Sequence, residues 1–236
     1  MEAEPLNAAQ EAVLERLAGI RQRIGAACRE AGRDAAEVTL MAVTKTVDPL
    51  LINTAVDAGV TVLGENRVQE FLSKRESYRT HAEVQFIGHL QTNKVKSIVG
   101  LVSMIQSVDS LHLAYAIERA AAAADIVMPV LLEVNIGGEA SKSGVSPDGL
   151  SALLDGVSAL PHLKVRGLMT IPPPEPDPGK QNAVFEKMQA LYESVRQPYR
   201  MDTLSMGMSG DYEAAVRHGA TLVRIGSALF GARIYR

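Results

Sequence analysis

The pattern of apolar and polar residues along this chain changes repeatedly between helical spacing and short, continuous apolar runs. Residues 7–31 carry apolar side chains at helical spacing, including Val13, Leu17, Ile20 and Ile24. This spacing predicts an amphipathic helix that precedes the first strand. From there to the end of the chain, short apolar runs typical of buried strands alternate with longer segments of helical period.

Eight strands are predicted, at residues 38–44, 60–63, 83–88, 102–107, 127–135, 164–170, 202–206 and 221–226. The intervening helices are predicted at residues 49–58, 66–79, 92–99, 110–124, 147–159, 179–197 and 211–218, with a short one near 227–231. Alternating strands and helices imply a parallel sheet with helices outside it. Eight strands favour a closed barrel over an open sheet. We therefore expect an α/β fold, a TIM-like (β/α)8 barrel with an extra N-terminal helix, and one domain spanning residues 1–236.

Turn residues support these boundaries. Asp48 followed by Pro49 predicts a helix N-cap with proline at the first helical position. Gly59 and Gly219 follow predicted helices where a left-handed residue is favoured. Residues 171–179 are so rich in proline that we expect a stiff exposed loop after the sixth strand, without helix, at the rim of the site.

Composition narrows the class of protein. Hydrophobic residues make up 47% of the 236 residues, aromatic residues only 4%, and the net charge is -3. We expect a globular chain that binds neither nucleic acid nor membranes, because it has no basic run and no apolar run of membrane-spanning length. Cys28 is the single cysteine and falls in phase with the apolar face of the first helix, which predicts buried packing. A lone cysteine and the lack of a signal peptide fit the cytoplasm.

Two glycine- and serine-rich turns near the C-terminus are the strongest chemical signal. They follow the last two predicted strands and contain Ser209, Gly210, Gly226 and Ser227, which we call the phosphate cup. Small residues there let backbone N–H groups approach an anion, as the last two loops of many barrels do for phosphate. The alternative is purely structural: Ser209 caps the following helix, and the glycines only permit turns.

Lys45 follows the predicted first strand, at the barrel face where active sites lie. An amine among apolar walls can have a lowered pKa and attack an aldehyde. Together with a phosphate site, it suggests pyridoxal 5'-phosphate (PLP) held as a Schiff base. The alternative is a rim lysine that reaches into water.

Three further side chains are candidates. Arg224 lies within an apolar run, so it either pairs with a carboxylate or points into the barrel beside the cup. In the second role it would face the pyridine nitrogen of the cofactor. Asn66 could lie near the cofactor or form a capping box with Gln69. His89 could act as an acid–base group or be a loop residue at the barrel mouth. No residues show metal-ligand spacing.

Together these residues resemble a known family, the pyridoxal phosphate homeostasis proteins (the YggS/PROSC family). The matching segments cover nearly the whole chain after residue 35 and lie at residues 42–46, 64–70, 86–94, 106–109, 135–144 and 166–169 and in both halves of the phosphate cup. The resemblance implies a barrel similar to the N-terminal domain of alanine racemase. Two departures from the family pattern lie beside the site, at Val84–Gln85 and at Thr46–Asp48.

The resemblance also implies roles for individual residues. Lys45 would be the Schiff-base lysine, Arg224 would face the pyridine nitrogen, and Asn66 would lie near the cofactor. The phosphate would be bound by Ser209, Gly226 and Ser227. The expected function is a monomeric carrier of PLP in PLP homeostasis, without substantial catalysis, which supplies apo forms of PLP-dependent enzymes.

Two alternatives remain open. One is an amino-acid racemase or related PLP enzyme. The other is an aldolase in which Lys45 forms a Schiff base with a sugar phosphate. Racemisation needs a second proton donor, and we expect this chain, which ends after the eighth strand–helix unit, to lack the C-terminal β domain that supplies it in alanine racemases. Tyr212 and Tyr235 are the nearest tyrosines in sequence to the cup, and we expect neither to lie over the ring.

Overall fold

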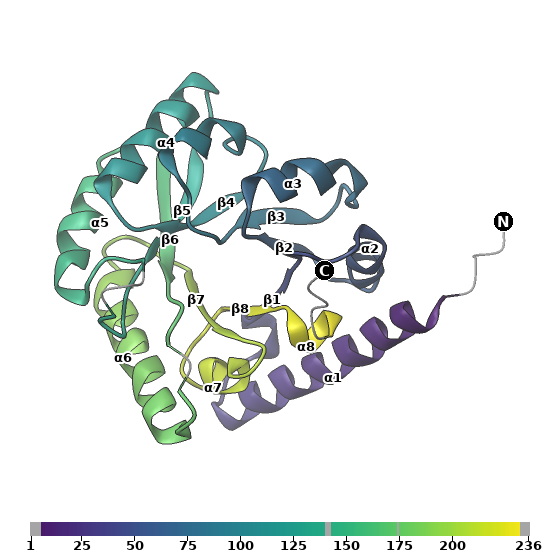
Figure 1. Cartoon of the computed structure of the whole chain (residues 1–236). Helices are drawn as coiled ribbons and strands as arrows, with labels where there is room; N and C mark the ends of the chain where they lie inside the picture. Colours follow the sequence, from purple (N-terminus) through teal and green to yellow (C-terminus); the bar gives the residue numbers. More distant parts are fainter. Residues whose placement is uncertain (1–5, 140–142, 174, 232–236) are drawn as a thin grey trace.

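The eight strands form one closed, parallel barrel in the order β1 to β8 (Figure 1). The computed structural model describes residues 6–139, 143–173 and 175–231. The strands are β1 (Thr39–Val43), β2 (Val62–Glu65), β3 (Glu83–Phe86), β4 (Met104–Val108), β5 (Met128–Glu133), β6 (Leu163–Met169), β7 (Thr203–Met208) and β8 (Leu222–Ile225). Pairing of β1 with β8 closes the barrel, so the turns after all eight strands meet at one mouth.

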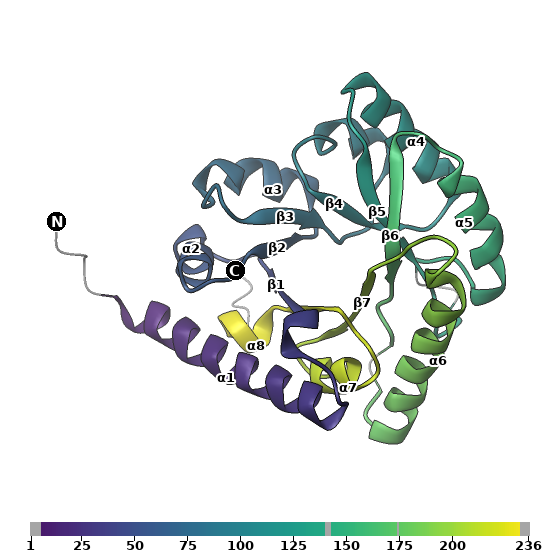
Figure 2. The ribbon, with the colours of Figure 1, turned by 180° about the vertical axis from the view of Figure 1, so that it is seen from behind.

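Helices surround the barrel on the outside (Figures 1 and 2). They are α1 (Ala8–Glu30), α2 (Pro49–Asp57), α3 (Val68–Lys74), α4 (Leu111–Ala123), α5 (Leu150–Ser158), α6 (Pro178–Arg196), α7 (Tyr212–Arg217) and α8 (Ser227–Phe230). Short 3₁₀ segments are η1 (Ala35–Glu37), η2 (Arg75–Ser77), η3 (Thr92–Ser97) and η4 (Pro147–Gly149). The N-terminal helix α1 lies along the outside of the seam between β8 and β1, against α2, α7 and α8.

Apolar side chains divide into an outer and an inner layer. The main core fills the space between the strands and the helices, and α1 contributes the face that includes Val13, Leu17 and Ile20. A smaller cluster inside the barrel includes Met41 and Ile87. Because side chains alternate along a strand, each strand supplies both layers, and the inner layer leaves room for a polar interior.

The (β/α)8 barrel and its N-terminal helix are confirmed. Asp48 caps α2 by accepting the Leu50 N–H, and Gly59 and Gly219 have positive φ, as expected. Several predicted boundaries are wrong in detail, among them the strand predicted at 60–63, which is Val62–Glu65, and three helical segments. The segment 92–99 is the 3₁₀ segment η3 rather than an α-helix, and the helix predicted at 66–79 ends at Lys74 and continues as η2.

The third helical difference concerns the end of the proline-rich loop. Pro178 and Gly179 form the first turn of α6, with Asp177 as its N-cap, although we expected no helix before residue 179. Proline is compatible with the first helical position, because its missing N–H needs no partner there. The loop proper is therefore shorter than predicted.

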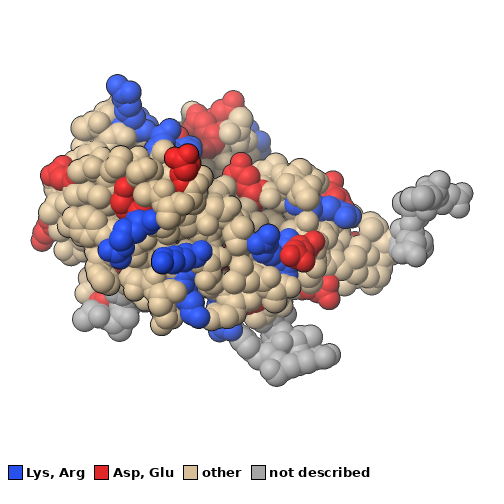
Figure 3. All heavy atoms as spheres, turned by 90° about the horizontal axis from the view of Figure 1, so that it is seen from above, with Lys and Arg blue, Asp and Glu red and all other residues tan. Residues whose placement is uncertain are grey.

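The surface carries both signs of charge. In the face seen in Figure 3, Lys and Arg side chains are interspersed with Asp and Glu, as expected for a net charge of -3. In the described part of the chain, no helix is both long and apolar enough to span a membrane. Over the same residues, no group of three or more His, Cys, Asp and Glu side chains could hold a metal ion.

Candidate functional site

A cavity of about 280 Å³ opens at the mouth where the carboxyl ends of the strands meet. All the residues expected to bind the cofactor line it: Lys45, Asn66, Ser209, Arg224, Gly226 and Ser227. Its apolar lining includes Val43, Ile87, Ile171 and Met208. Closure of the barrel thus brings the turns after β1 and β2 together with those after β7 and β8 at one site.

A larger cavity, of about 580 Å³, lies at the opposite mouth of the barrel. Its lining includes Thr39, Glu83, Arg166 and Asp202, and Arg166 already pairs with Asp202 at 2.7 Å. None of the predicted site residues lines it. Because active sites of such barrels lie at the carboxyl ends of the strands, the smaller cavity is the better candidate.

Lys45 lies in a tight turn that follows β1. The Val47 N–H donates to the Thr44 carbonyl at 3.1 Å, which makes Lys45 and Thr46 the two central residues of the turn. Thr46 has φ of 61°, in the left-handed region that β-branched residues rarely adopt. This turn directs Lys45 into the cavity beside Val43, on the side of the strand that alternation predicts.

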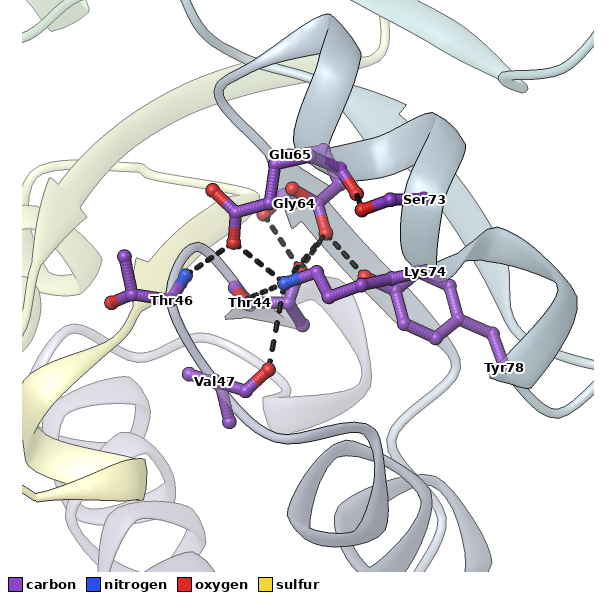
Figure 4. A network of polar contacts seen from close by, with 9 residues as sticks. Thr44, Thr46, Val47, Gly64, Glu65, Ser73, Lys74 and Tyr78 are labelled. Carbon is purple, nitrogen blue, oxygen red and sulfur yellow. Dashed lines mark hydrogen bonds and ion pairs between the residues drawn. The ribbon is translucent and has the colours of Figure 1, made fainter.

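The outer side of the same turn contacts α3 (Figure 4). Thr44 Oγ1 donates to the buried Glu65 Oε1 at 2.6 Å, and the Tyr78 hydroxyl donates to the same oxygen. Lys74 Nζ donates to the Thr44 carbonyl at 2.9 Å. Burial and the bond to Glu65 raise the pKa of Tyr78 well above its usual value, which keeps it a hydrogen-bond donor. The glycine-rich turns and Lys45, which marked the site in the sequence, did not predict this hydrogen-bond network.

Ser209 bridges the two turns of the phosphate cup. Its Oγ accepts the Gly226 N–H at 3.1 Å and the Ala228 N–H at 3.2 Å. Ser209 therefore joins the turn after β7 to the start of α8 rather than capping α7, the helix that follows it in the chain. The turn after β7 is closed instead by Asp211, which accepts the Met208 N–H.

Arg224 is buried in the barrel interior and lines the cavity. Nη1 donates to Ser205 Oγ at 2.7 Å, and Nη2 donates to the Thr170 carbonyl at 2.7 Å. Its direct partners in the described chain are thus a hydroxyl and a carbonyl, and the alternative of direct pairing with a carboxylate is wrong. Burial lowers the pKa of Arg224 to about 10, against the charges of Asp211 and Glu133.

The polar chain continues from Arg224 across the barrel. Ser205 Oγ donates to Gln106 Oε1 at 2.7 Å, and Gln106 Nε2 donates to Gln85 Oε1 at 2.6 Å. All three residues are buried. Gln85 is thus part of the chain of hydrogen bonds that holds the arginine.

Two carboxylic acids near Arg224 are electrostatically perturbed. Burial raises the pKa of Glu133 to about 7; the nearby charge of Asp109 adds to this, and Arg224 opposes it. Burial also raises the pKa of Asp211, against the Met208 N–H and Arg224. Neither residue stands out in the sequence, because each is a single acid at a strand end or in a turn.

Of the two remaining candidates, Asn66 lines the cavity and His89 does not. The Oδ1 of Asn66 is buried with no hydrogen-bond partner. Because the N-cap of α3 is Arg67, without a side-chain bond, the capping box of Asn66 with Gln69 is wrong. His89 is exposed and lines a different cavity with Lys94, so it is a loop residue at the barrel mouth.

Tyr212 and Tyr235 are the tyrosines nearest to the phosphate cup in sequence. Tyr212 packs in the outer core, and its hydroxyl accepts from Arg23 Nε of α1 at 2.6 Å. Its side chain is therefore directed away from the cavity, as expected. Tyr235 lies outside the described residues.

Comparison with known proteins assigns the chain to a family. The model of the alanine racemase N-terminal domain matches residues 16–234. The pyridoxal phosphate homeostasis protein of Aquifex aeolicus is 46% identical over 224 residues, covering 94% of this chain and 98% of the relative. The chain belongs to the pyridoxal phosphate homeostasis protein family. The member from Escherichia coli K12 is 40% identical over 94% of this chain and 97% of its own length.

Solved structures agree with this membership. PipY of Synechococcus elongatus, determined with PLP bound, is 32% identical and superposes with a TM-score of 0.81, covering 93% of this chain and all of PipY. Alanine racemase from Corynebacterium glutamicum is 16% identical, with a TM-score of 0.71 over 93% of this chain and 60% of the racemase. At that identity the racemase supports the fold alone. Family membership and the resemblance inferred from sequence coincide.

Proposed function

We propose that this protein binds PLP, through a Schiff base with Lys45 and through its phosphate in the cup, and that it acts as a PLP carrier in homeostasis without substantial catalysis. The observation that supports the proposal most directly is the shared cavity. Lys45, Asn66, Arg224 and the phosphate cup all line one space, although they come from the first two and the last two strand–turn units of the barrel.

The residues present fit this cofactor. A Cβ built on Gly210 meets nothing within 4 Å, so the cup is open toward the cavity at that turn. Ser209 and Ser227 add hydroxyl groups suited to a phosphate, and Val43 and Ile87 supply apolar walls for a ring. The unpartnered Oδ1 of Asn66 is a buried acceptor that a bound hydroxyl or ammonium group could satisfy.

The chemistry supplied by the bound cofactor is that of an aldehyde, which condenses with an amine and releases water. In this protein the amine is that of Lys45. Arg224 carries only N–H donors, so it can face the pyridine nitrogen only as a donor and would keep that nitrogen unprotonated. An unprotonated ring is a poor electron sink, which supports a carrier rather than a catalyst.

The proposal also covers the cellular location, the oligomeric state and the partners of the protein. We propose that it works in the cytoplasm as a monomeric single domain spanning residues 1–236, and that apo PLP-dependent enzymes receive the cofactor from it. The aldolase alternative predicts a colourless protein that binds a sugar phosphate. No observation in the cavity favours that ligand over PLP.

The direct test is spectroscopic. Freshly purified protein should be yellow, and borohydride should bleach the Schiff-base absorbance and fix the adduct on Lys45, as located by mass mapping. Lys45→Ala should abolish the absorbance and the adduct without lowering the melting temperature appreciably, because its side chain lies in the cavity rather than in the core. Lys96→Ala, an exposed change on η3, is the matched control. An adduct on another lysine, with none on Lys45, would refute the assignment.

A further inference from the structure

The turn that carries Lys45 has an unfavourable backbone conformation. Thr46, directly after the lysine, has φ of 61°. A left-handed residue at the second central position of a turn is usually glycine or asparagine. Strained backbone of this kind persists only where surrounding contacts hold it, and it is common at functional sites. The contacts that hold this turn therefore decide where Lys45 lies.

Two residues of α3 supply those contacts, and they act on both sides of Lys45. Glu70 Oε1 accepts the Thr46 N–H. Lys74 Nζ donates to the Thr44 carbonyl at 2.9 Å and approaches the Val47 carbonyl at 3.5 Å. Figure 4 shows the Lys74 ammonium directed at the turn from α3, with Thr44, Thr46 and Val47 around it.

The pair is charged, shielded and internally bonded. Lys74 Nζ donates to Glu70 Oε1 at 2.7 Å, and the two side chains are only 14% and 19% exposed. Glu65, fully buried, lies 3.9 Å from the same ammonium. Burial would raise the pKa of Glu70, but the bonds from Lys74 and Thr46 outweigh it and hold that pKa below its usual value. Glu70 thus stays an acceptor at neutral pH.

We propose that Glu70 and Lys74 are positioning residues for Lys45: they hold the strained turn from outside the barrel and so aim the amine at the aldehyde of the bound cofactor. Neither residue lines the cavity, so both act through the Thr44–Val47 backbone. The inference rests on the proposed Schiff base. The bond forms between the Lys45 nitrogen and the aldehyde carbon, and the aldehyde oxygen leaves as water.

The test separates total binding from covalent binding. Equilibrium dialysis measures all PLP bound, and absorbance divides it into free aldehyde and Schiff base. In Glu70→Ala and Lys74→Met, we expect the equilibrium constant for Schiff-base formation within the bound complex to fall about tenfold or more, because a misplaced amine loses its orientation. Noncovalent binding through the cup should change little. Glu70→Gln, which keeps an acceptor for the Thr46 N–H, should restore part of the loss.

Matched controls are Glu76→Ala and Lys96→Met, which alter exposed side chains outside the network. An unchanged covalent fraction in folded Glu70→Ala would overturn the proposal. So would a loss of total binding in step with a lower melting temperature at a constant covalent fraction, since the two residues would then serve the fold alone. If Lys74→Met does not fold, the two Glu70 variants decide.

A measurement without ligand keeps this inference distinct from the proposed function. If the wild-type protein forms no Schiff base on Lys45, the proposed function fails. Hydrogen exchange of the Thr46 amide then tests the turn itself: protection should be present in the wild type and lost in Glu70→Ala. Equal protection in the two proteins would overturn the positioning role.

Discussion

Ser209 is a single residue whose hydroxyl joins both halves of the phosphate cup, and this makes it a sensitive probe. Ser209→Asp would place a negative charge against the phosphate, and we expect PLP affinity to fall about a hundredfold, because opposed like charges cost several kcal/mol. Ser209→Ala should cost much less, since the Gly226 and Ala228 N–H groups would become available to the phosphate. Titration followed by absorbance measures both.

Pyridoxal, which lacks the phosphate, is the matching control on the ligand side. Pyridoxal should bind the wild-type protein poorly. Its affinity should differ little between the wild-type protein and Ser209→Asp. Equal affinity of the wild-type protein for pyridoxal and PLP would show that the cup does not bind phosphate.

Glu133 gives a second residue-scale prediction, for the protein without ligand. Its pKa is about 7 in the folded state and 4.5 in the reference state, so folding favours its protonated form. The destabilisation that follows is absent below the unfolded pKa, grows as pH rises between the two values and is complete above the folded pKa. Its upper size is about 3 kcal/mol, from about 1.4 kcal/mol per pKa unit.

Glu133→Gln should remove that penalty. Denaturant unfolding at pH 5 and pH 8 should show the variant gaining free energy of unfolding relative to wild type at pH 8, and little or nothing at pH 5. Because the charge of Asp109 adds to the rise in the pKa of Glu133, Asp109→Asn should produce a smaller change of the same sign. A Glu133→Gln effect that is equal at both pH values would contradict the assigned shift.

At the scale of secondary-structure elements, the loops that follow β2 and β3 are in close backbone contact at the mouth of the barrel. A Cβ added to Gly88, after β3, would lie 2.1 Å from the carbonyl oxygen of Asn66, after β2. Gly88→Ala must therefore displace the loop that carries Asn66. We expect a loss of about 1–3 kcal/mol in stability, as for other overpacked sites, and weaker PLP binding in the same titration.

Gly19 in α1 provides the opposite case. A Cβ there meets nothing within 4 Å, and alanine favours a helix over glycine by about 0.5–1 kcal/mol. Gly19→Ala should raise the melting temperature and leave PLP binding unchanged. An unchanged or higher stability of Gly88→Ala would contradict the overpacking expected at Gly88.

At the scale of the whole molecule, we expect little or no racemase activity. Two-sided proton transfer needs a donor on each face of the bound amino acid, and Lys45 can serve only one. The nearby tyrosine in the described chain, Tyr212, is held outside the barrel by Arg23. Incubation with L-alanine in deuterated water should give slow α-deuterium incorporation at most. Incorporation or D-alanine formation at ordinary enzymatic rates, abolished by Lys45→Ala, would favour the enzyme.

The sequence by itself determined the order of strands and helices, the closed barrel and the chemistry gathered at one mouth. Those features depend on short-range information: the period of apolar positions, glycine at left-handed positions, and small residues in two turns. Lys45 and the phosphate cup could be assigned to one site because parallel strands place their carboxyl ends together. The sequence predicted that Ser209 belongs to the phosphate cup, but it did not predict the hydrogen bonds from Gly226 and Ala228 to its hydroxyl oxygen.

Only the tertiary structure decided the partners of those residues. Glu70 and Lys74 meet the Lys45 turn because pairing of β1 with β2 places α3 beside it, a contact across more than one element that no local pattern encodes. Barrel closure likewise places Ser205 and Thr170, rather than a carboxylate, within hydrogen-bond distance of Arg224. Local periodicity determines which way a side chain faces, whereas the register between strands far apart in the chain determines what it meets there.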